Sequence, residues 1–192
     1  MKQNRVRIIG GEWRSRFITF PDQQDLRPTP DRVRETLFNW LGQDLTGLRC
    51  LDLFAGSGAL GFEAASRGAK QVTMVERERD ACAALEANRK TLNATRVEIV
   101  RADALHFLRG APGVYDVVFV DPPFAAAGVW AALFEMLPPW LTAAACVYCE
   151  SGDKLTPPAG WAVHKHSRAG QVHYQLLKRI THDDQSSLPR HL

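Results

Sequence analysis

After Gly47 the chain alternates between short apolar runs and helix-like segments, and this alternation constrains its fold more than any other feature. The apolar runs predict strands near residues 50–54, 72–76, 97–100, 114–120 and 145–149. The segments between them predict helices near residues 59–67, 79–92 and 129–137. Apolar strands that alternate with helices are typical of a parallel sheet covered by helices on both faces. We therefore expect an α/β domain built on a mostly parallel sheet.

The two ends of this alternating region follow different patterns. Residues 161–166 and 172–178 alternate between polar and apolar side chains around Gly170, which predicts an antiparallel hairpin that closes the sheet. Upstream, Thr29 and Pro30 predict the cap and the first residue of a helix. A chain of 192 residues is long enough for one domain with a full core. We expect an N-terminal hairpin extension over residues 1–25, one domain over 26–180 and a polar tail over 181–192.

Positive charge is concentrated at the N-terminus. Residues 1–20 have a net charge of +4, whereas the whole chain has +3, so the other 172 residues sum to −1. If Gly10 and Gly11 form a hairpin turn, the two faces of the hairpin separate four arginines from four apolar side chains. The arginines are Arg5, Arg7, Arg14 and Arg16, and the apolar residues are Val6, Ile8, Trp13 and Phe17.

Opposed like charges destabilise a hairpin unless a ligand neutralises them, so we expect this face to bind the phosphates of a nucleic acid. It is the only dense positive patch that the sequence suggests. A solvated edge hairpin is the alternative, because charged edge strands are common. A polyanion would then be bound elsewhere, and the next candidates are Arg27, Arg32 and Arg34.

A glycine-rich turn follows the first predicted strand of the domain. Gly56, Gly58 and Gly61 match the dinucleotide-binding pattern, and Glu76 closes the next strand, where it could accept hydrogen bonds from ribose hydroxyls. A nicotinamide cofactor would fit this much. However, a carboxylate at Asp52 would repel a pyrophosphate, while it would favour the ammonium and sulfonium groups of S-adenosylmethionine.

Asp103 follows the third predicted strand, where it could bind the adenine amino group. Alternatively, Asp52 and Asp103 could simply cap turns or helices. The set of acids in this order favours a site for S-adenosylmethionine.

The tetrapeptide Asp121-Pro122-Pro123-Phe124 ends the fourth predicted strand. An amino group on a nucleobase is a poor nucleophile because its lone pair is conjugated with the ring. The Asp121 carboxylate and a backbone carbonyl turned outward by the prolines could accept its two N–H bonds, and Phe124 could stack on the base. The alternative is that the prolines only break the strand. An acid and an aromatic ring on either side of the prolines favour a role in methyl transfer.

The sequence contains four cysteines, and Cys146 and Cys149 are the only closely spaced pair. A spacing of three in a strand places their side chains on opposite faces, so we expect buried structural thiols and no metal site. No apolar run is long enough to span a membrane, and we expect a cytoplasmic protein.

Four segments together resemble the RsmD family of bacterial ribosomal RNA methyltransferases: residues 7–11, 26–41, 51–61 and 121–124. The similarity continues through residues 170–174, and the segment 26–41 is its most specific part. Pro30 departs from the Thr that the family often has, a conservative change at a helix start.

The resemblance implies a class I methyltransferase fold, Rossmann-like, with a mostly parallel seven-stranded sheet and an antiparallel C-terminal hairpin. It implies a cofactor site at Asp52, Phe54, Gly56, Ser57, Gly58, Glu76, Arg77, Asp103 and Ala104, and a base site at Asp121, Pro122, Pro123 and Phe124.

The expected activity is methylation of N2 of one guanine in 16S ribosomal RNA, with S-adenosylmethionine as cofactor and without a metal. The substrate is either naked RNA or an assembled or partly assembled small subunit, and the enzyme is expected to be a monomer. An adenine-N6 methyltransferase is the first alternative, although such DNA enzymes normally carry an additional recognition domain. A non-catalytic ribosome assembly factor is the second.

Overall fold

The computed structural model describes residues 3–22, 28–123 and 128–180. Seven strands form one sheet in the order β5-β4-β3-β6-β7-β9-β8, and β1 and β2 form a separate two-stranded sheet. Strands β3 to β7 run parallel, while β9 is antiparallel to both β7 and β8. Their bounds are β1 Gln3–Arg7, β2 Phe17–Pro21, β3 Arg49–Asp52, β4 Gln71–Glu76, β5 Val97–Arg101, β6 Tyr115–Val120, β7 Leu141–Ser151, β8 Trp161–Ala169 and β9 Val172–Arg179.

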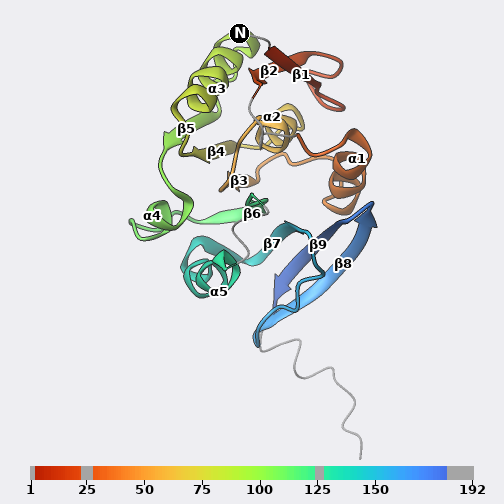
Figure 1. The fold of residues 1–192 in the computed structure, drawn as a ribbon, viewed down its shortest axis with the longest axis vertical. Helices are drawn as coiled ribbons and strands as arrows, with labels where there is room; N and C mark the ends of the chain where they lie inside the picture. Colours follow the sequence, from red (N-terminus) through yellow and green to blue (C-terminus); the bar gives the residue numbers. More distant parts are fainter. Residues whose placement is uncertain (1–2, 23–27, 124–127, 181–192) are drawn as a thin grey trace, which may run out of the picture.

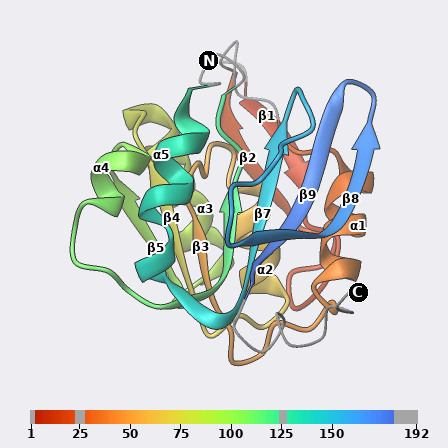
Figure 2. The same ribbon diagram turned by 90° about the horizontal axis from the view of Figure 1, so that it is seen from below.

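Helices cover both faces of this sheet (Figure 1). Helices α1, α2 and α3 lie on one face together with the N-terminal strands, and α4 and α5 lie on the other. Figure 2 shows the molecule from below, with α5 in front of the sheet and α2 behind it. The helices are α1 Asp31–Trp40, α2 Ala59–Ser66, α3 Arg79–Leu92, α4 Ala104–Leu108 and α5 Val129–Met136, and a 3-10 turn, η2, spans Pro138–Trp140.

The two faces have separate apolar cores. The first includes Phe38 of α1, Phe62 of α2 and Leu85 of α3, and the second includes Leu108 of α4 and Leu133 of α5. Burial of large apolar side chains on both faces explains why the strands have so few polar residues. The predicted parallel sheet and the closing hairpin are therefore confirmed, and helix α3 has the predicted bounds.

The order of the sheet reverses between β3 and β6. From β3 the chain continues outward to β4 and β5 on one side, and then returns to β6 and β7 on the other. Asp52, the last residue of β3, is in register with Phe119 of β6. Asp52 and Asp121 therefore lie at the carboxyl-terminal ends of neighbouring strands, at the same end of the sheet. In open α/β sheets this reversal point is where ligands bind.

Two predictions about the N-terminal third are wrong. Pro30, and not Thr29, occupies the N-cap position of α1, and it makes no side-chain capping bond. The hairpin does not turn at Gly10-Gly11, because β1 pairs with β2 through Arg7–Phe17 and Arg5–Thr19, and residues 8–16 form a long connection. Consequently the four arginines are not paired across one face. Phe17 is 52% exposed, and Ile18 and Phe20 are buried in its place.

This connection follows a different path because it packs against α2. Gly11 has a φ of +77°, and a Cβ atom there would lie 1.9 Å from the carbonyl oxygen of Ser66. The backbone N–H of Trp13 donates to the Ser66 hydroxyl at 2.9 Å, and that hydroxyl donates to the carbonyl of Gly10 at 2.6 Å. Glycine at position 11 is thus required by a close backbone approach.

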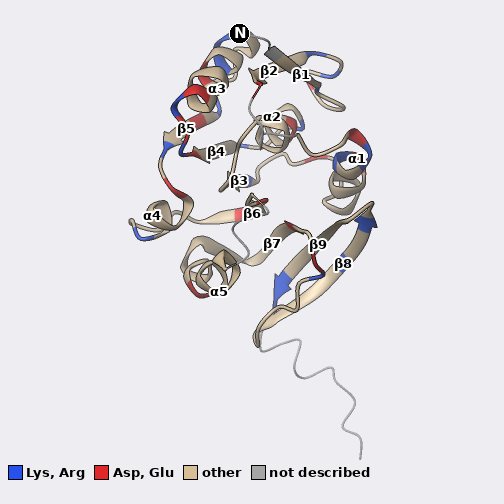
Figure 3. Ribbon diagram, viewed as in Figure 1, with Lys and Arg blue, Asp and Glu red and all other residues tan. Residues whose placement is uncertain are grey.

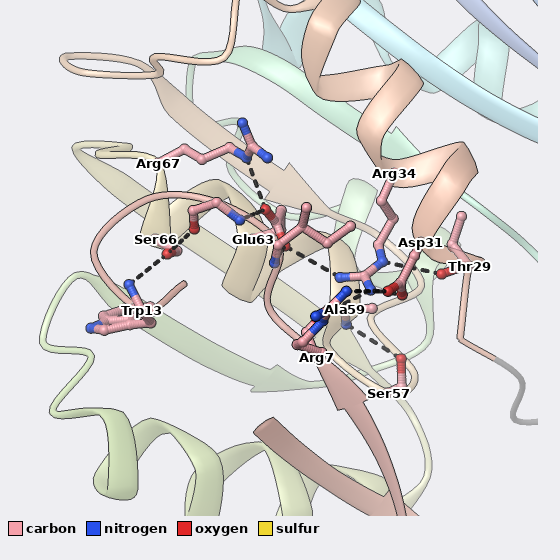
Figure 4. A network of polar contacts seen from close by, with 12 residues as sticks. Arg7, Trp13, Thr29, Asp31, Arg34, Ser57, Ala59, Glu63, Ser66 and Arg67 are labelled. Atoms are coloured by element: carbon pink, nitrogen blue, oxygen red, sulfur yellow. Dashed lines mark hydrogen bonds and ion pairs between the residues drawn. The ribbon is translucent and has the colours of Figure 1, made fainter. Parts of the chain in front are cut away.

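A fully buried carboxylate, Glu63 of α2, holds the same segment (Figure 4). It accepts hydrogen bonds from the backbone N–H groups of Ile9 and Gly10, each at 2.8 Å. It also accepts from the guanidinium groups of Arg34 at 3.2 Å and Arg67 at 2.9 Å. A buried charge is tolerated only when it is paired and hydrogen-bonded in this way.

Cys146 and Cys149 lie on opposite faces of their strand, as predicted, although Cys146 is only partly buried. Cys146 packs against the first core and Cys149 belongs to the second, so their side chains occupy opposite faces of β7. All four cysteines are free. No helix in the described part of the chain is long and apolar enough to cross a membrane.

We expect Glu63→Gln to destabilise the protein by about 3 kcal/mol, because an amide would leave the Arg67 guanidinium without its carboxylate partner and Arg34 with Asp31 alone. The measurement is urea unfolding, with the slope checked for equality between variants. Glu86→Gln is the matched control, since its ion pair with Arg89 is partly exposed, and its removal should change stability by no more than about 0.5 kcal/mol. Equal losses in the two variants would show that the buried Glu63 network contributes no more to stability than a partly exposed ion pair.

Candidate functional site

The glycine turn between β3 and α2 has the conformation that its sequence predicts. Gly56 and Gly58 have φ values of +51° and +80°. Gly58 is also the N-cap residue of α2, and a Cβ atom there would lie 2.6 Å from the side chain of Leu85. Ser57 is buried, and its hydroxyl accepts from the N–H of Ala59 at 3.3 Å. The turn therefore brings backbone N–H groups to the edge of the sheet at the start of a helix.

Asp52 lies beside this turn and is almost completely buried. Burial raises the pKa of Asp52 to about 7, although hydrogen bonds from the backbone of Phe54 and Gly61 oppose the shift and the charge of Glu76 adds to it. A carboxylate whose charge is this poorly solvated gains from the arrival of a cation. Phe54 is partly buried and packs against the second core.

Glu76 ends β4, and both of its carboxylate oxygens accept hydrogen bonds from the backbone. Oε2 accepts from the N–H of Gly56 at 2.9 Å, and Oε1 accepts from the N–H of Glu78 at 2.8 Å. Glu76 therefore links the glycine turn to the next strand. Arg77 is exposed and forms an ion pair with Glu78 at 3.0 Å.

Asp103 is the N-cap residue of α4, where its carboxylate accepts from the N–H of His106 at 3.0 Å. The capping alternative therefore applies to Asp103, but its side chain is exposed at the same edge as Glu76, so capping does not preclude contact with a ligand. Ala104 is buried in the first turn of α4.

Asp121 follows the last residue of β6, and its environment is acidic. Burial raises the pKa of Asp121 well above its usual range, the charges of Glu150 and Asp52 raise it further, and a hydrogen bond with the Thr29 hydroxyl opposes the shift. Pro122 is buried and Pro123 is exposed. Phe124 lies outside the described residues, so its expected stacking role stays a prediction.

The sequence patterns missed Glu150 and Thr29. Glu150 is buried near the end of β7, one position beyond the register pair Val120–Cys149, which places it beside Asp121. Its Oε2 accepts a hydrogen bond from the buried Tyr148 hydroxyl at 2.9 Å. An acid directly after the apolar run 145–149 was the available signal. Burial raises the pKa of Glu150, while the bond from Tyr148 opposes that shift.

The expected RNA-binding arginines have different environments. Arg34 is 1% exposed and bonded to Glu63, Asp31 and the carbonyls of Thr29 and Arg7, so its expected RNA contact is wrong. Arg27 lies outside the described residues. Five of the predicted arginines are exposed at the surface: Arg5, Arg7, Arg14, Arg16 and Arg32.

Comparisons with known proteins agree with this architecture. The family model described as "Conserved hypothetical protein 95" matches residues 6–178. Ribosomal RNA small subunit methyltransferase D of Escherichia coli (strain K12) is 44% identical over 180 residues, covering 91% of this chain and 90% of the relative. The protein of the same name from Haemophilus influenzae is 41% identical, covering 92% of this chain and 95% of the relative.

Solved structures show the same fold. The structure of yhhF from Escherichia coli has a TM-score of 0.84 and 44% identity, covering 92% of this chain and 98% of its own. A Haemophilus influenzae structure has a TM-score of 0.78 and 38% identity, with coverages of 93% and 100%. The expected class I methyltransferase fold is confirmed, and the similarity includes the N-terminal segment as well as the sheet.

We expect the affinity for S-adenosylmethionine to fall as the pH is lowered through about 7, by up to tenfold per pH unit. The pKa of Asp52 in the free protein is about 7. Below that pH the carboxyl is protonated, and a cationic ligand must expel the proton before it gains the charge interaction. The measurement is calorimetric binding between about pH 5.5 and 7.5 in buffers of different ionisation enthalpy, which also reports proton release. Asp52→Asn should bind weakly and with little pH dependence, and a wild-type affinity that is level across this range would contradict the assignment.

Proposed function

The chain belongs to the family described as Conserved hypothetical protein 95, and from that premise we propose that it methylates N2 of a guanine in 16S ribosomal RNA with S-adenosylmethionine as cofactor. The relatives named Ribosomal RNA small subunit methyltransferase D support the reaction and the class of substrate. The observation that carries the proposal is the position of Asp52 and Asp121 on neighbouring strands, at the point where the order of the sheet reverses.

The residues around the glycine turn fit the cofactor. The turn at Gly56 and Gly58, where both φ angles are positive, lies beside Asp52, whose buried carboxylate gains from a nearby positive charge. Glu76 would accept hydrogen bonds from the ribose, and Asp103 would contact the adenine. When bound, the cofactor supplies an activated methyl group.

Asp121 would hold the amino group that receives the methyl group. The arrival of two N–H donors stabilises the ionised carboxylate, so a base edge compensates for the burial that otherwise raises the pKa of Asp121. Alignment of the amine and exclusion of water are the main contributions of the protein, and no protein nucleophile is required. The proton leaves after methyl transfer, when the methylated nitrogen is much more acidic.

A carboxylate at Asp121 favours guanine over adenine. Guanine presents N1–H and N2–H donors on one edge, and one carboxylate can accept from both. Adenine presents a donor beside an acceptor on the corresponding edge, so the second oxygen of Asp121 would face a lone pair. We therefore rank adenine-N6 methylation below guanine-N2 methylation, and a non-catalytic assembly factor below both.

The proposal is tested by transfer of a radiolabelled methyl group to three substrates: deproteinised small-subunit rRNA, assembled small subunits and duplex DNA. Transfer to rRNA, naked or assembled, supports the proposal and identifies the form that is recognised. Transfer to duplex DNA alone would favour the adenine-N6 alternative. Cofactor binding without transfer to any substrate would favour the assembly factor.

We expect Asp121→Ala to lower the rate of methyl transfer by about a hundredfold, because one charge-assisted bond to the reacting amine is worth on the order of 3 kcal/mol. Cofactor affinity, measured by calorimetry, should stay within about fivefold of wild type, a change of roughly 1 kcal/mol. Asp153→Ala removes an exposed carboxylate near the same edge and is the matched control. A collapse of cofactor binding in Asp121→Ala would assign this residue to the cofactor site instead.

We also propose that the exposed arginines of the N-terminal segment bind RNA phosphates. Arg7 forms an ion pair with Asp31 and Arg16 donates to the carbonyl of Thr91, so Arg5 and Arg14 provide the cleaner test. Replacement of both by Gln should weaken RNA binding and reduce the salt slope by about 1.5, close to one unit per phosphate contact. Salt titrations that give parallel slopes for the variant and wild type would exclude these contacts.

A further inference from the structure

A second basic region lies at the opposite end of the chain. Residues 154–180 contain no Asp or Glu and five basic residues: Lys154, Lys165, Arg168, Lys178 and Arg179. The expectation that the N-terminal segment holds the only dense positive charge is therefore wrong. Figure 3 shows Lys and Arg at both ends of the hairpin formed by β8 and β9, without an acidic residue along it.

Strand β8 of this hairpin is open to solvent, whereas the middle of β9 is buried. Strand β8 forms an edge of the seven-stranded sheet, where it pairs with β9, and its side chains at positions 162–166 are all exposed. Charged side chains on edge strands commonly prevent aggregation. Exposure and charge alone therefore do not indicate a ligand. A role in substrate binding also requires that these cations lie near the active site.

The strand register places one end of the hairpin beside the active site. Glu150 of β7 pairs with Tyr174 of β9, and Tyr174 pairs with Ser167 of β8. In the next row, Ser151 pairs with His173, which pairs with Arg168. The first of these rows begins beside Asp121, and the second is one residue further along the strands. Arg168 is three strands away from Asp121, so their backbones are about three inter-strand spacings, or roughly 15 Å, apart at the same end of the sheet.

The other end of the hairpin points away from the active site. Lys178 pairs with Cys146 of β7 and with Ala162 of β8, and Arg179 pairs with Trp161. The hairpin therefore carries two basic groups at opposite ends, and only one of them is near the reacting atoms.

The charges around a histidine pair show that the near end is locally positive. The rings of His166 and His173 stack with centroids 5.4 Å apart, and Nε2 of His166 lies 3.1 Å from Nδ1 of His173. Slight burial lowers the pKa of His166, and the charges of Lys154 and His173 lower it further. The Leu155 backbone, next to Lys154, bonds to the side chain of Gln175, which is the register partner of His166. These contacts bring Lys154 to the same end as Arg168.

The carboxyl groups of Asp52, Asp121 and Glu150 lie together at the site and disfavour a phosphate there. An RNA strand that places a base there must have its phosphates bound alongside. This inference rests on the proposed function. We propose that the near end of the β8–β9 hairpin binds the RNA backbone on one side of the target nucleotide. This end is formed by Lys154, His166, Arg168 and His173. The positive charge, the exposure and the register each favour this partner.

The test compares two double variants that each remove two positive charges from the same hairpin. Lys154→Gln with Arg168→Gln changes the near end, and Lys178→Gln with Arg179→Gln is the matched control at the far end. Affinity for deproteinised rRNA and for small subunits is measured at several salt concentrations, together with methyl transfer and cofactor binding. The near-end variant should reduce the salt slope by about 1.5 and weaken binding by about tenfold, close to one unit of slope per phosphate contact. The control should change neither quantity, and cofactor binding should stay unchanged in both.

Arg168 also bonds to the carbonyl of Gly170 and to Gln171 within its own turn, so the near-end variant could lose the shape of the hairpin. Lys154→Gln with Arg168→Lys keeps one charge at that position and should restore about half of the lost slope, roughly 0.7, whereas loss of local structure would give no rescue.

Equal effects of the near-end and far-end variants would overturn the inference. If wild type binds both substrates, a defect on assembled subunits but not on deproteinised rRNA would assign the surface to a ribosomal protein and also overturn it. Wild type that methylates no RNA would instead refute the proposed function.

Discussion

The buried ion pair between Arg34 and Glu63 is the interaction on which the rest of the structure most depends. It joins α1 to α2, and the same carboxylate accepts from the backbone of Ile9 and Gly10, so the N-terminal segment is fixed to the domain as well. Neither charge is exposed to water, so each needs a charged partner, and Asp31 and Arg67 complete the pairing of Arg34 and Glu63. The result is a rigid connection among three segments that are far apart in the sequence.

This connection holds two sides of the active site in place. Gly58, at the end of the turn proposed for the cofactor, is the N-cap of helix α2, and Thr29, just before α1, lowers the pKa of Asp121 through a side-chain hydrogen bond. The parallel sheet supplies the third side, because adjacent parallel strands place Asp52 and Asp121 at one edge. Acidity at this edge suits a cationic cofactor and a base with N–H donors. The same acidity disfavours RNA phosphates in the site, which is consistent with the phosphate contacts proposed at the N-terminal segment and at the β8–β9 hairpin.

Much of the fold and of the candidate site could be predicted from the sequence. The predictions that failed in the N-terminal segment and at Arg34 share one cause. The sheet, helix α3 and the acids at the strand ends follow from local patterns, since apolar periodicity reports which face of an element is buried. The turn at Gly10-Gly11 was wrong because Glu63 and Ser66 of a distant helix bind that backbone. Arg34 looked like a surface cation because its buried partner Glu63 is 29 residues away. Local patterns cannot identify such partners, whereas Glu150, directly after an apolar run, was a local signal that was overlooked.

The central claim is that this site methylates the exocyclic amine of guanine. The most direct test is to identify the product: small-subunit rRNA is incubated with the enzyme and S-adenosylmethionine, digested to nucleosides, and analysed by chromatography and mass spectrometry against standards. Asp121 as a double acceptor for N1–H and N2–H predicts N2-methylguanosine as the product. N6-methyladenosine, or a guanosine methylated at another position, would contradict the account.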